Sequence, residues 1–165
     1  MAFDIAGDLD RGISAYSHVP GLVEHIKRAV GADPGGEILG QVGIRAFILR
    51  PEENVFAAYI LTQDAFVVAE MSREGSTLAV WMDLSRISRV AEIVHEGRRT
   101  LTVEIDGDMR RTDFEAETAS QTENGASQGR GILRGRTIPA SYEIAAPAEE
   151  GELAWFALQI RRINR

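Results

Sequence analysis

The spacing of apolar residues divides the chain into a helical stretch, a long run of strands and a second helical stretch. After Pro20, apolar residues recur every three or four positions, which predicts a helix that ends at Gly31 with a left-handed cap. Its apolar stripe consists of Leu22, Val23, Ile26, Ala29 and Val30. Residues 1–12 are predicted to form a loose acidic lead-in. We therefore interpret residues 1–36 as an N-terminal extension with one helix.

From residue 37 onward, apolar and polar residues alternate, which predicts about seven short β-strands joined by tight turns. The ranges that we expect to form them are 37–48, 55–62, 65–72, 77–82, 87–96, 100–106, 109–118 and a last strand or pair within 131–144. Strands joined by short turns pair antiparallel, since parallel neighbours need a long crossover. Residues 119–129 offer almost no side chain to bury and are predicted to form a flexible loop.

Two of the predicted strands, 55–62 and 65–72, are apolar at nearly every position, so we expect both of their faces to be covered. The range 100–106 alternates instead. Its inward-facing residues are Leu101, Val103 and Ile105. Asp106-Gly107 then favours a type I′ turn, because both central positions of that turn need positive φ. The sequence therefore predicts a hairpin that pairs 100–106 with 109–118.

Pro147 is predicted to start a C-terminal helix, because a helical period returns there with acidic residues near its beginning and arginines near its end. Its apolar stripe consists of Leu153, Phe156, Ala157, Ile160 and Ile163. The order of elements predicts an α+β fold, mainly β, in which an antiparallel, partly open barrel or sandwich is capped by this helix. We expect residues 37–165 to form the barrel domain, and the whole chain to be one folding unit.

Two stretches resemble segments of bacterial pleckstrin-homology-like and GRAM-like domains. Tyr59–Val68 is similar to the hairpin of their second and third strands, which reads as an apolar strand, a threonine, a polar turn and a second apolar strand. Trp81–Val90 is similar to a downstream segment in which apolar residues alternate with polar pairs. The resemblance spans about residues 37–163. It implies a pleckstrin-homology-like barrel with the terminal helix plugging one end, and it carries little information about function.

Members of this family that bind inositol phosphates place several Lys or Arg residues around the loop between their first two strands. The corresponding loop here is Arg50–Asn54, in which Glu52 and Glu53 would repel a phosphorylated headgroup. Only Arg45 and Arg50 oppose these two carboxylates. The composition of this loop therefore disfavours phosphoinositide binding at the family's usual position.

The chain has 165 residues, a net charge of -7 and no cysteine. This length suits one domain, and the lack of cysteine excludes disulfides, thiolate metal sites and cysteine nucleophiles. The negative charge disfavours nucleic acid as a partner. The first residues do not resemble a secretory signal, and no apolar run approaches the length of a transmembrane helix. We expect a cytoplasmic protein, or a virion component assembled in the cytoplasm, with membrane-surface contact not favoured.

The strongest candidate for a binding segment is the glycine-rich stretch that contains Arg130, Arg134 and Arg136. Guanidinium groups bind carboxylate or phosphate in a two-pronged way, and glycine permits close approach. The competing interpretation, which we favour, is that these arginines protect an edge strand from aggregation. Trp155 is the other candidate. It lies beside the stripe of the terminal helix, where we favour packing against the barrel mouth over exposure to a partner.

The three histidines do not predict a metal site, because His18 and His25 lack a third ligand and fit a solvated helix face. His95 is interpreted as a residue that caps an edge strand. Serines and paired carboxylates occur without the spacing of a known catalytic motif, so no catalytic residue and no cofactor is predicted.

These patterns favour a non-enzymatic protein-interaction or assembly module, such as a bacterial or phage scaffold component. Its expected partner is another protein or a second copy in a homo-oligomer. The alternative is a module that binds a small anionic ligand or lipid through the arginine-rich segment 130–136.

Overall fold

The computed structural model describes residues 5–106, 114–117 and 141–163. The elements in chain order are α1 (Ile5–Ser14), α2 (Leu22–Ala29), β1 (Ile44–Pro51), β2 (Val55–Thr62), β3 (Ala65–Ser72), β4 (Thr77–Asp83), the short 3-10 helix η1 (Leu84–Arg86), β5 (Ile87–His95), β6 (Arg98–Ile105), β7 (Phe114–Glu117), β8 (Ser141–Pro147) and α4 (Gly151–Ile163).

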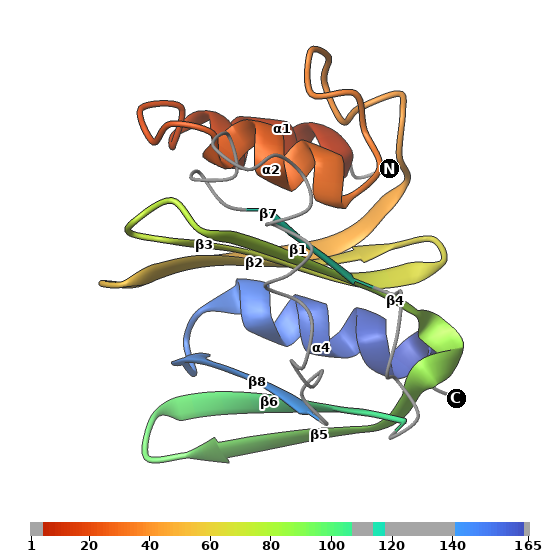
Figure 1. Ribbon diagram of the computed structural model, residues 1–165. Helices are drawn as coiled ribbons and strands as arrows, with labels where there is room; N and C mark the ends of the chain where they lie inside the picture. Colours follow the sequence, from red (N-terminus) through yellow and green to blue (C-terminus); the bar gives the residue numbers. More distant parts are fainter. Residues whose placement is uncertain (1–4, 107–113, 118–140, 164–165) are drawn as a thin grey trace.

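The strands form two antiparallel sheets, ordered β1-β2-β3-β4-β7 and β5-β6-β8. Helices α1 and α2 cover the outer face of the first sheet, and α4 lies between the two sheets (Figure 1). The predicted α+β fold, mainly β, is therefore confirmed. The sheets do not close into a barrel, and the terminal helix fills the space between them.

The strands β2 and β3 are covered on both faces, as their apolar composition predicts. Ile60 and Val67 are buried against the helices α1 and α2, whereas Leu61, Phe66 and Val68 are buried on the side of α4. Phe66 meets two other rings there edge to face. Its ring centroid is 5.8 Å from that of Tyr142 on β8 and 6.2 Å from that of Phe156 on α4. One aromatic cluster thus joins the first sheet, the second sheet and the terminal helix.

The prediction of a loose lead-in at residues 1–12 is wrong for the part that the structure describes. Residues from Ile5 onward form α1, which buries Ala6, Leu9 and Ile13 on the first sheet. The helix approaches β1 closely at Gly12, where an added Cβ would lie 3.2 Å from Cδ1 of Leu49. Glycines weaken a helix taken alone, so packing on the sheet decides this element rather than local propensity.

The strand expected from residue 37 begins only at Ile44, because residues 37–43 form turns. The carboxylate of Asp10 holds these turns. Its two oxygens accept hydrogen bonds from the backbone N–H groups of Ile38 and Leu39, at 2.8 and 2.9 Å. Ile38 is fully buried as a result, although it belongs to no strand.

The predicted pairing of strand 100–106 with strand 109–118 is also wrong. Both sides of β6 are occupied, by β5 and by β8, whereas β7 pairs with β4. Pro147 ends β8 rather than starting the helix, and α4 begins at Gly151. The predicted loop 119–129 and most of the last predicted strand lie outside the described residues. The residues of a turn indicate where the chain bends, but they do not determine which strand the next segment pairs with.

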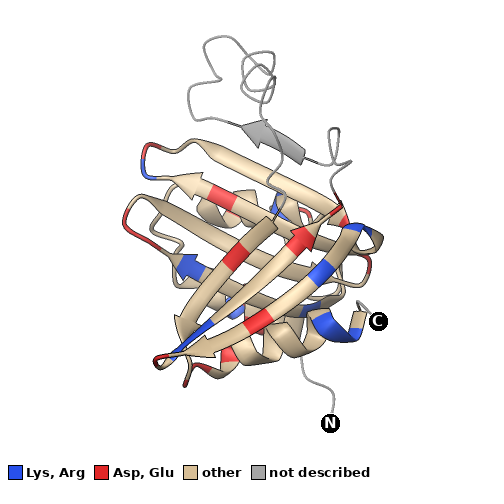
Figure 2. Ribbon diagram, turned by 90° about the horizontal axis from the view of Figure 1, so that it is seen from below, with Lys and Arg blue, Asp and Glu red and all other residues tan. Residues whose placement is uncertain are grey.

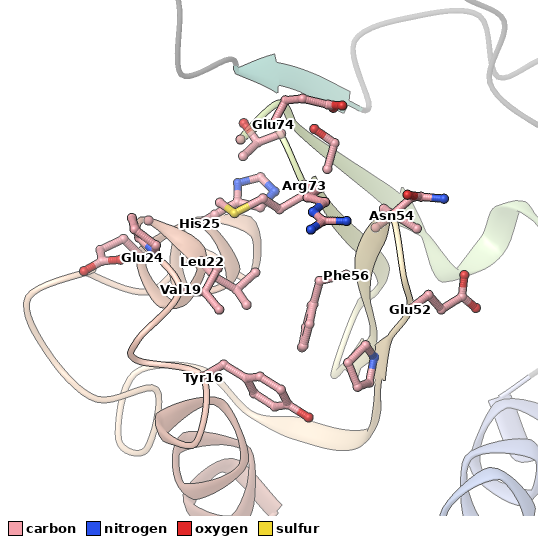
Figure 3. A pocket seen from close by; sticks show the side chains of 18 of the residues that line it. Tyr16, Val19, Leu22, Glu24, His25, Glu52, Asn54, Phe56, Arg73 and Glu74 are labelled. Atoms are coloured by element: carbon pink, nitrogen blue, oxygen red, sulfur yellow. The ribbon is translucent and has the colours of Figure 1, made fainter.

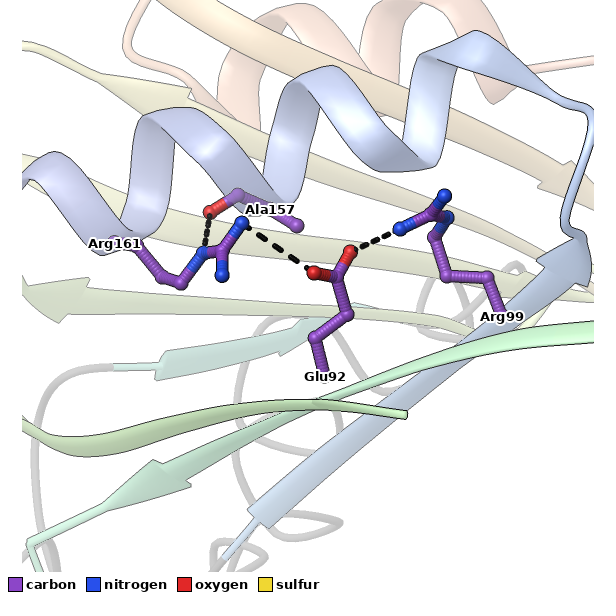
Figure 4. Close-up of polar contacts among 4 residues, drawn as sticks. All are labelled: Glu92, Arg99, Ala157 and Arg161. Atoms are coloured by element: carbon purple, nitrogen blue, oxygen red, sulfur yellow. Dashed lines mark hydrogen bonds and ion pairs between the residues drawn. The ribbon is translucent and has the colours of Figure 1, made fainter. Parts of the chain in front are cut away.

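The second sheet is tied to α4 by a cluster of three charged side chains (Figure 4). Glu92 on β5 accepts from Nη1 of Arg99 on β6 at 2.5 Å, and its other oxygen lies 3.3 Å from Nη2 of Arg161 on α4. Arg161 also donates from Nε to the carbonyl of Ala157 at 3.3 Å. Glu92 and Arg99 are mostly buried, with side chains 15% and 20% exposed. The carboxylate of Glu92 therefore compensates the charges of two arginines where the second sheet meets α4.

We expect Asp10→Ala to lower the free energy of unfolding by about 2 kcal/mol, because two backbone N–H groups lose a charged acceptor. Urea unfolding measures this change. The matched control is Asp8→Ala on the same helix, which removes only an exposed ion pair with Arg11 and should cost less than about 1 kcal/mol. Equal losses for the two variants would contradict the anchoring role of Asp10.

A second prediction concerns the charged cluster. Glu92→Ala should lower the free energy of unfolding by about 2 kcal/mol, since it leaves the mostly buried Arg99 without its carboxylate. The comparison variant is Arg89→Ala, which breaks an exposed pair with Glu104 at 3.8 Å and should cost about 0.5 kcal/mol or less. If thermal and urea unfolding show that Glu92→Ala costs as little stability as Arg89→Ala, the cluster does not stabilise the contact between the second sheet and α4.

Candidate functional site

The described residues enclose a pocket of about 860 Å³, here called the hairpin pocket. It lies between the turn that joins α1 to α2, the start of α2, and the ends of the β1–β2 and β3–β4 hairpins (Figure 3). These elements meet here because α1 and α2 pack on the first sheet while the two hairpin turns extend past them. The pocket is therefore built from segments far apart in the sequence.

The floor of the hairpin pocket is apolar. Leu22 and Met71 are buried in it, and Phe56 and Tyr16 are partly exposed. Phe56 on β2 faces Met71 on β3 in the strand register, so both side chains lie on the helix side of the sheet. The rings of Phe56 and Tyr16 pack edge to face with centroids 4.7 Å apart. Val19 completes this floor from the α1–α2 turn (Figure 3).

Charged side chains surround this floor, and carboxylates outnumber guanidinium groups. The charged lining residues are Glu24, Arg28, Glu52, Glu53, Arg73 and Glu74. Acidic and basic residues are instead interspersed over the sheet formed by β5, β6 and β8 (Figure 2). The hairpin pocket therefore combines an apolar floor with a net negative rim, which attracts a basic apolar group rather than an anion.

His25 in the wall of this pocket is buried, with 6% of its surface exposed, and is not on a solvated helix face as predicted. Its Nε2 lies 3.1 Å from the carbonyl oxygen of Leu78 on β4, which links α2 to the sheet. His18 is exposed at the mouth, and His95 is exposed at the end of β5 beside Glu96. Within the described ranges, no three His, Asp or Glu residues are grouped in a way that could hold a metal ion.

The structure does not place the predicted binding residues in this pocket. Arg130, Arg134 and Arg136 lie outside the described residues. Trp155 is 40% exposed on α4 and lines a second hollow of about 760 Å³, here called the edge groove. The edge groove runs along β1, with Phe47 and Leu49 in its floor. Trp155 thus packs against the edge of a sheet and still offers part of its ring to solvent.

The pattern of the sequence does not indicate the residues that form the hairpin pocket, Tyr16 and Phe56 above all. Tyr16 follows a helix that the apolar pattern did not indicate, and Phe56 reads as one more apolar residue of a buried strand. The one local signal was Pro20, which marks the start of the helix beside the pocket. Only the approach of two hairpin turns to α2 makes these side chains a site.

The positive charge near the β1–β2 turn is already engaged. Nη1 and Nη2 of Arg50 both lie 3.4 Å from Oε2 of Glu150, just before α4. Burial and, to a smaller extent, the carboxylates of Glu70 and Glu52 together raise the pKa of the neighbouring Tyr59 to about 12, against the opposing charge of Arg50. The end of the first sheet next to the hairpin pocket is therefore an environment that disfavours additional negative charge.

Comparison with known proteins gives this chain no family. No protein-family model matches it, and no curated protein shows significant sequence similarity. None of the helices in the described ranges is long and apolar enough to cross a membrane. Function must therefore be argued from the geometry and charge of the hairpin pocket and of the edge groove.

The raised pKa of Tyr59 predicts a loss of stability at high pH. The phenol of the unfolded chain ionises near pH 10, while the folded protein keeps it neutral to about 12. The contribution is therefore complete below pH 10 and declines as the pH rises toward 12. Tyr59→Phe should lose less stability over this range than the wild type in urea unfolding. Parallel declines for the two proteins would contradict this assignment.

Proposed function

We propose that this chain is a non-enzymatic protein-interaction module that holds an apolar side chain of a basic partner segment in the hairpin pocket. The observation that carries the proposal is the combination of an apolar, aromatic floor with a rim in which carboxylates predominate. This combination selects against anionic ligands and in favour of a segment with both apolar and basic residues.

The dimensions of the pocket suit such an anchor. A volume of about 860 Å³ lies within the usual range of ligand pockets, roughly 300–1,000 Å³. The thioether of Met71 adapts to differently shaped apolar groups, and the faces of Tyr16 and Phe56 provide rigid contact area. Anchors of this kind supply most of the affinity in protein interfaces, while the charged rim sets specificity and the association rate.

The polar groups around the floor stabilise the walls of the pocket, which supports a binding role. His25 contacts the Leu78 carbonyl, the backbone N–H of Arg73 donates to the carbonyl of Asn54 at 3.0 Å, and Ser72 Oγ accepts from the N–H of Ser76 at 3.0 Å. These contacts fix the two hairpin turns relative to each other. A partner thus meets a preformed surface, and preformed surfaces lose less entropy on binding.

The pleckstrin-homology-like resemblance is retained as part of this proposal. What supports it is the arrangement of two antiparallel sheets with the terminal helix between them. Binding of an anion at the β1–β2 turn is not part of the proposal, because Glu52 and Glu53 lie there and Arg50 contacts Glu150.

A selection from a random peptide library displayed on phage tests this function. The wild type should enrich peptides with a large apolar residue flanked by Lys or Arg. Val19→Asp, which places a charge on the floor, should lower their affinity at least about tenfold. The variant with Glu52→Lys, Glu53→Lys and Glu74→Lys should instead select acidic flanks, because all three side chains are exposed on the rim.

The matched control for the charge reversal is Glu143→Lys, an exposed carboxylate on β8 away from the pocket. It should leave the selected motif and its affinity unchanged. Circular dichroism and urea unfolding check that each variant folds. The proposal is wrong if no motif is enriched, or if folded pocket variants select the same peptides as the wild type.

A further inference from the structure

The strand β1 has an open edge. It is the first strand in the order β1-β2-β3-β4-β7 and pairs only with β2 among the described strands. The N–H of Glu52 donates to the carbonyl of Val55 at 3.0 Å and closes the β1–β2 hairpin. Because hydrogen-bonded positions alternate along an antiparallel pair, Arg50, Ile48 and Ala46 exchange bonds with β2. The backbone groups of the residues between them, Phe47 and Leu49, therefore point to the open edge.

The centre of this edge lacks the protection that sheet edges usually have. Four consecutive residues there, from Ala46 to Leu49, are apolar and uncharged, and the charges and the proline of β1 stand only near its two ends. The edge strands of the second sheet carry charges along their length, with Arg89 and Glu92 on β5 and Glu143 on β8. Charges and proline are the usual means of keeping strand edges from pairing. The centre of β1 is thus suited to accept another strand.

The open edge faces the edge groove, whose walls come from two helices. Ile5 and Gly12 of α1 form one wall, and Gly151 and Trp155 of α4 form the other. Helix α1 lies above the first sheet and α4 below it (Figure 1). A strand added at this edge would therefore extend the sheet and cover Trp155, which is 40% exposed in the single chain.

We propose that the occupant of this groove is β1 of a second copy of this chain, paired antiparallel about a two-fold axis at Ile48. In this register Phe47 of one copy faces Leu49 of the other, and each pair exchanges two backbone hydrogen bonds. The two first sheets become one continuous sheet. A two-fold interface of this kind is self-complementary, since each residue meets its counterpart on both copies.

Charge at the two ends of β1 argues for a second copy rather than for an unrelated strand. Arg45 lies at the start of the strand, and Glu52 and Glu53 follow its end. Antiparallel pairing about Ile48 brings Arg45 of each copy next to the carboxylates of the other. Among the described residues the Nε of Arg45 has no hydrogen-bond partner, and carboxylates of a second copy beside this guanidinium group would compensate its charge.

The mass of the purified full chain in solution, measured by light scattering over a range of concentrations, tests this pairing. The wild type should approach twice the monomer mass of 18.1 kDa as the concentration rises. Arg45→Glu should shift the midpoint of dimer formation to at least about tenfold higher concentration, because like charges then face each other. Adding Glu52→Lys and Glu53→Lys to Arg45→Glu should restore dimer formation.

Arg89→Glu serves as the control, since it reverses a charge on the edge of the other sheet and should leave the mass unchanged. Urea unfolding checks that each charge variant folds. A wild type that stays at 18.1 kDa overturns the proposal. So does a dimer that folded Arg45→Glu does not weaken, or one that the compensating lysines do not restore.

The register is tested separately by oxidation of cysteine variants, for which a chain without native cysteine is well suited. Facing positions in a hydrogen-bonded antiparallel pair have Cα atoms about 5.5 Å apart, which a disulfide can span. A mixture of Phe47→Cys and Leu49→Cys should cross-link to the heterodimer, and each variant alone should cross-link poorly. Equal cross-linking of the single variants would overturn the Ile48 axis. The peptide selection at the hairpin pocket does not bear on either result.

Discussion

The fold depends on one constraint, which is that both faces of the β2–β3 hairpin are apolar and must be kept from water. A single covering layer could not satisfy it, because successive side chains of a strand point to opposite faces. Helices α1 and α2 cover one face, and α4 with the second sheet covers the other. The Phe66 cluster and the charged group around Glu92 then hold α4 and the second sheet in place.

The same constraint positions both hollows. Helices placed over the centre of the first sheet leave its hairpin ends and its β1 edge less covered, and the hairpin pocket and the edge groove lie there. Tyr16 lines both of them, at the point where the chain leaves α1. Under the two proposals, a dimer joined at β1 would present two hairpin pockets. Two linked sites bind a repetitive or dimeric partner with an avidity beyond that of either pocket.

The distribution of charge also distinguishes the hairpin pocket and the β1 edge from the rest of the molecule. The chain carries a net charge of -7, and two of its partly buried arginines lie next to carboxylates, Arg50 beside Glu150 and Arg99 beside Glu92. The rim of the hairpin pocket departs from this pattern, with carboxylates in excess. The ends of β1 depart from it in another way, with opposite charges separated along one strand. Such uneven charge orients encounters between proteins more than it stabilises a fold.

Several elements could be predicted because their signals are local. The period of apolar residues predicted α2, β2 and β3, the alternation in β6 predicted its inward face, and Gly31 adopts the left-handed conformation expected of a helix cap, with φ of 87°. Other features could not be predicted, because they depend on contact between segments that are distant in the sequence. Helix α1 exists because it packs on β1, His25 is buried because β4 supplies a carbonyl, and β7 joins β4 because both sides of β6 are taken. The period of apolar residues indicates which face of a helix or strand is apolar. Which element packs against that face depends on the packing of the whole chain.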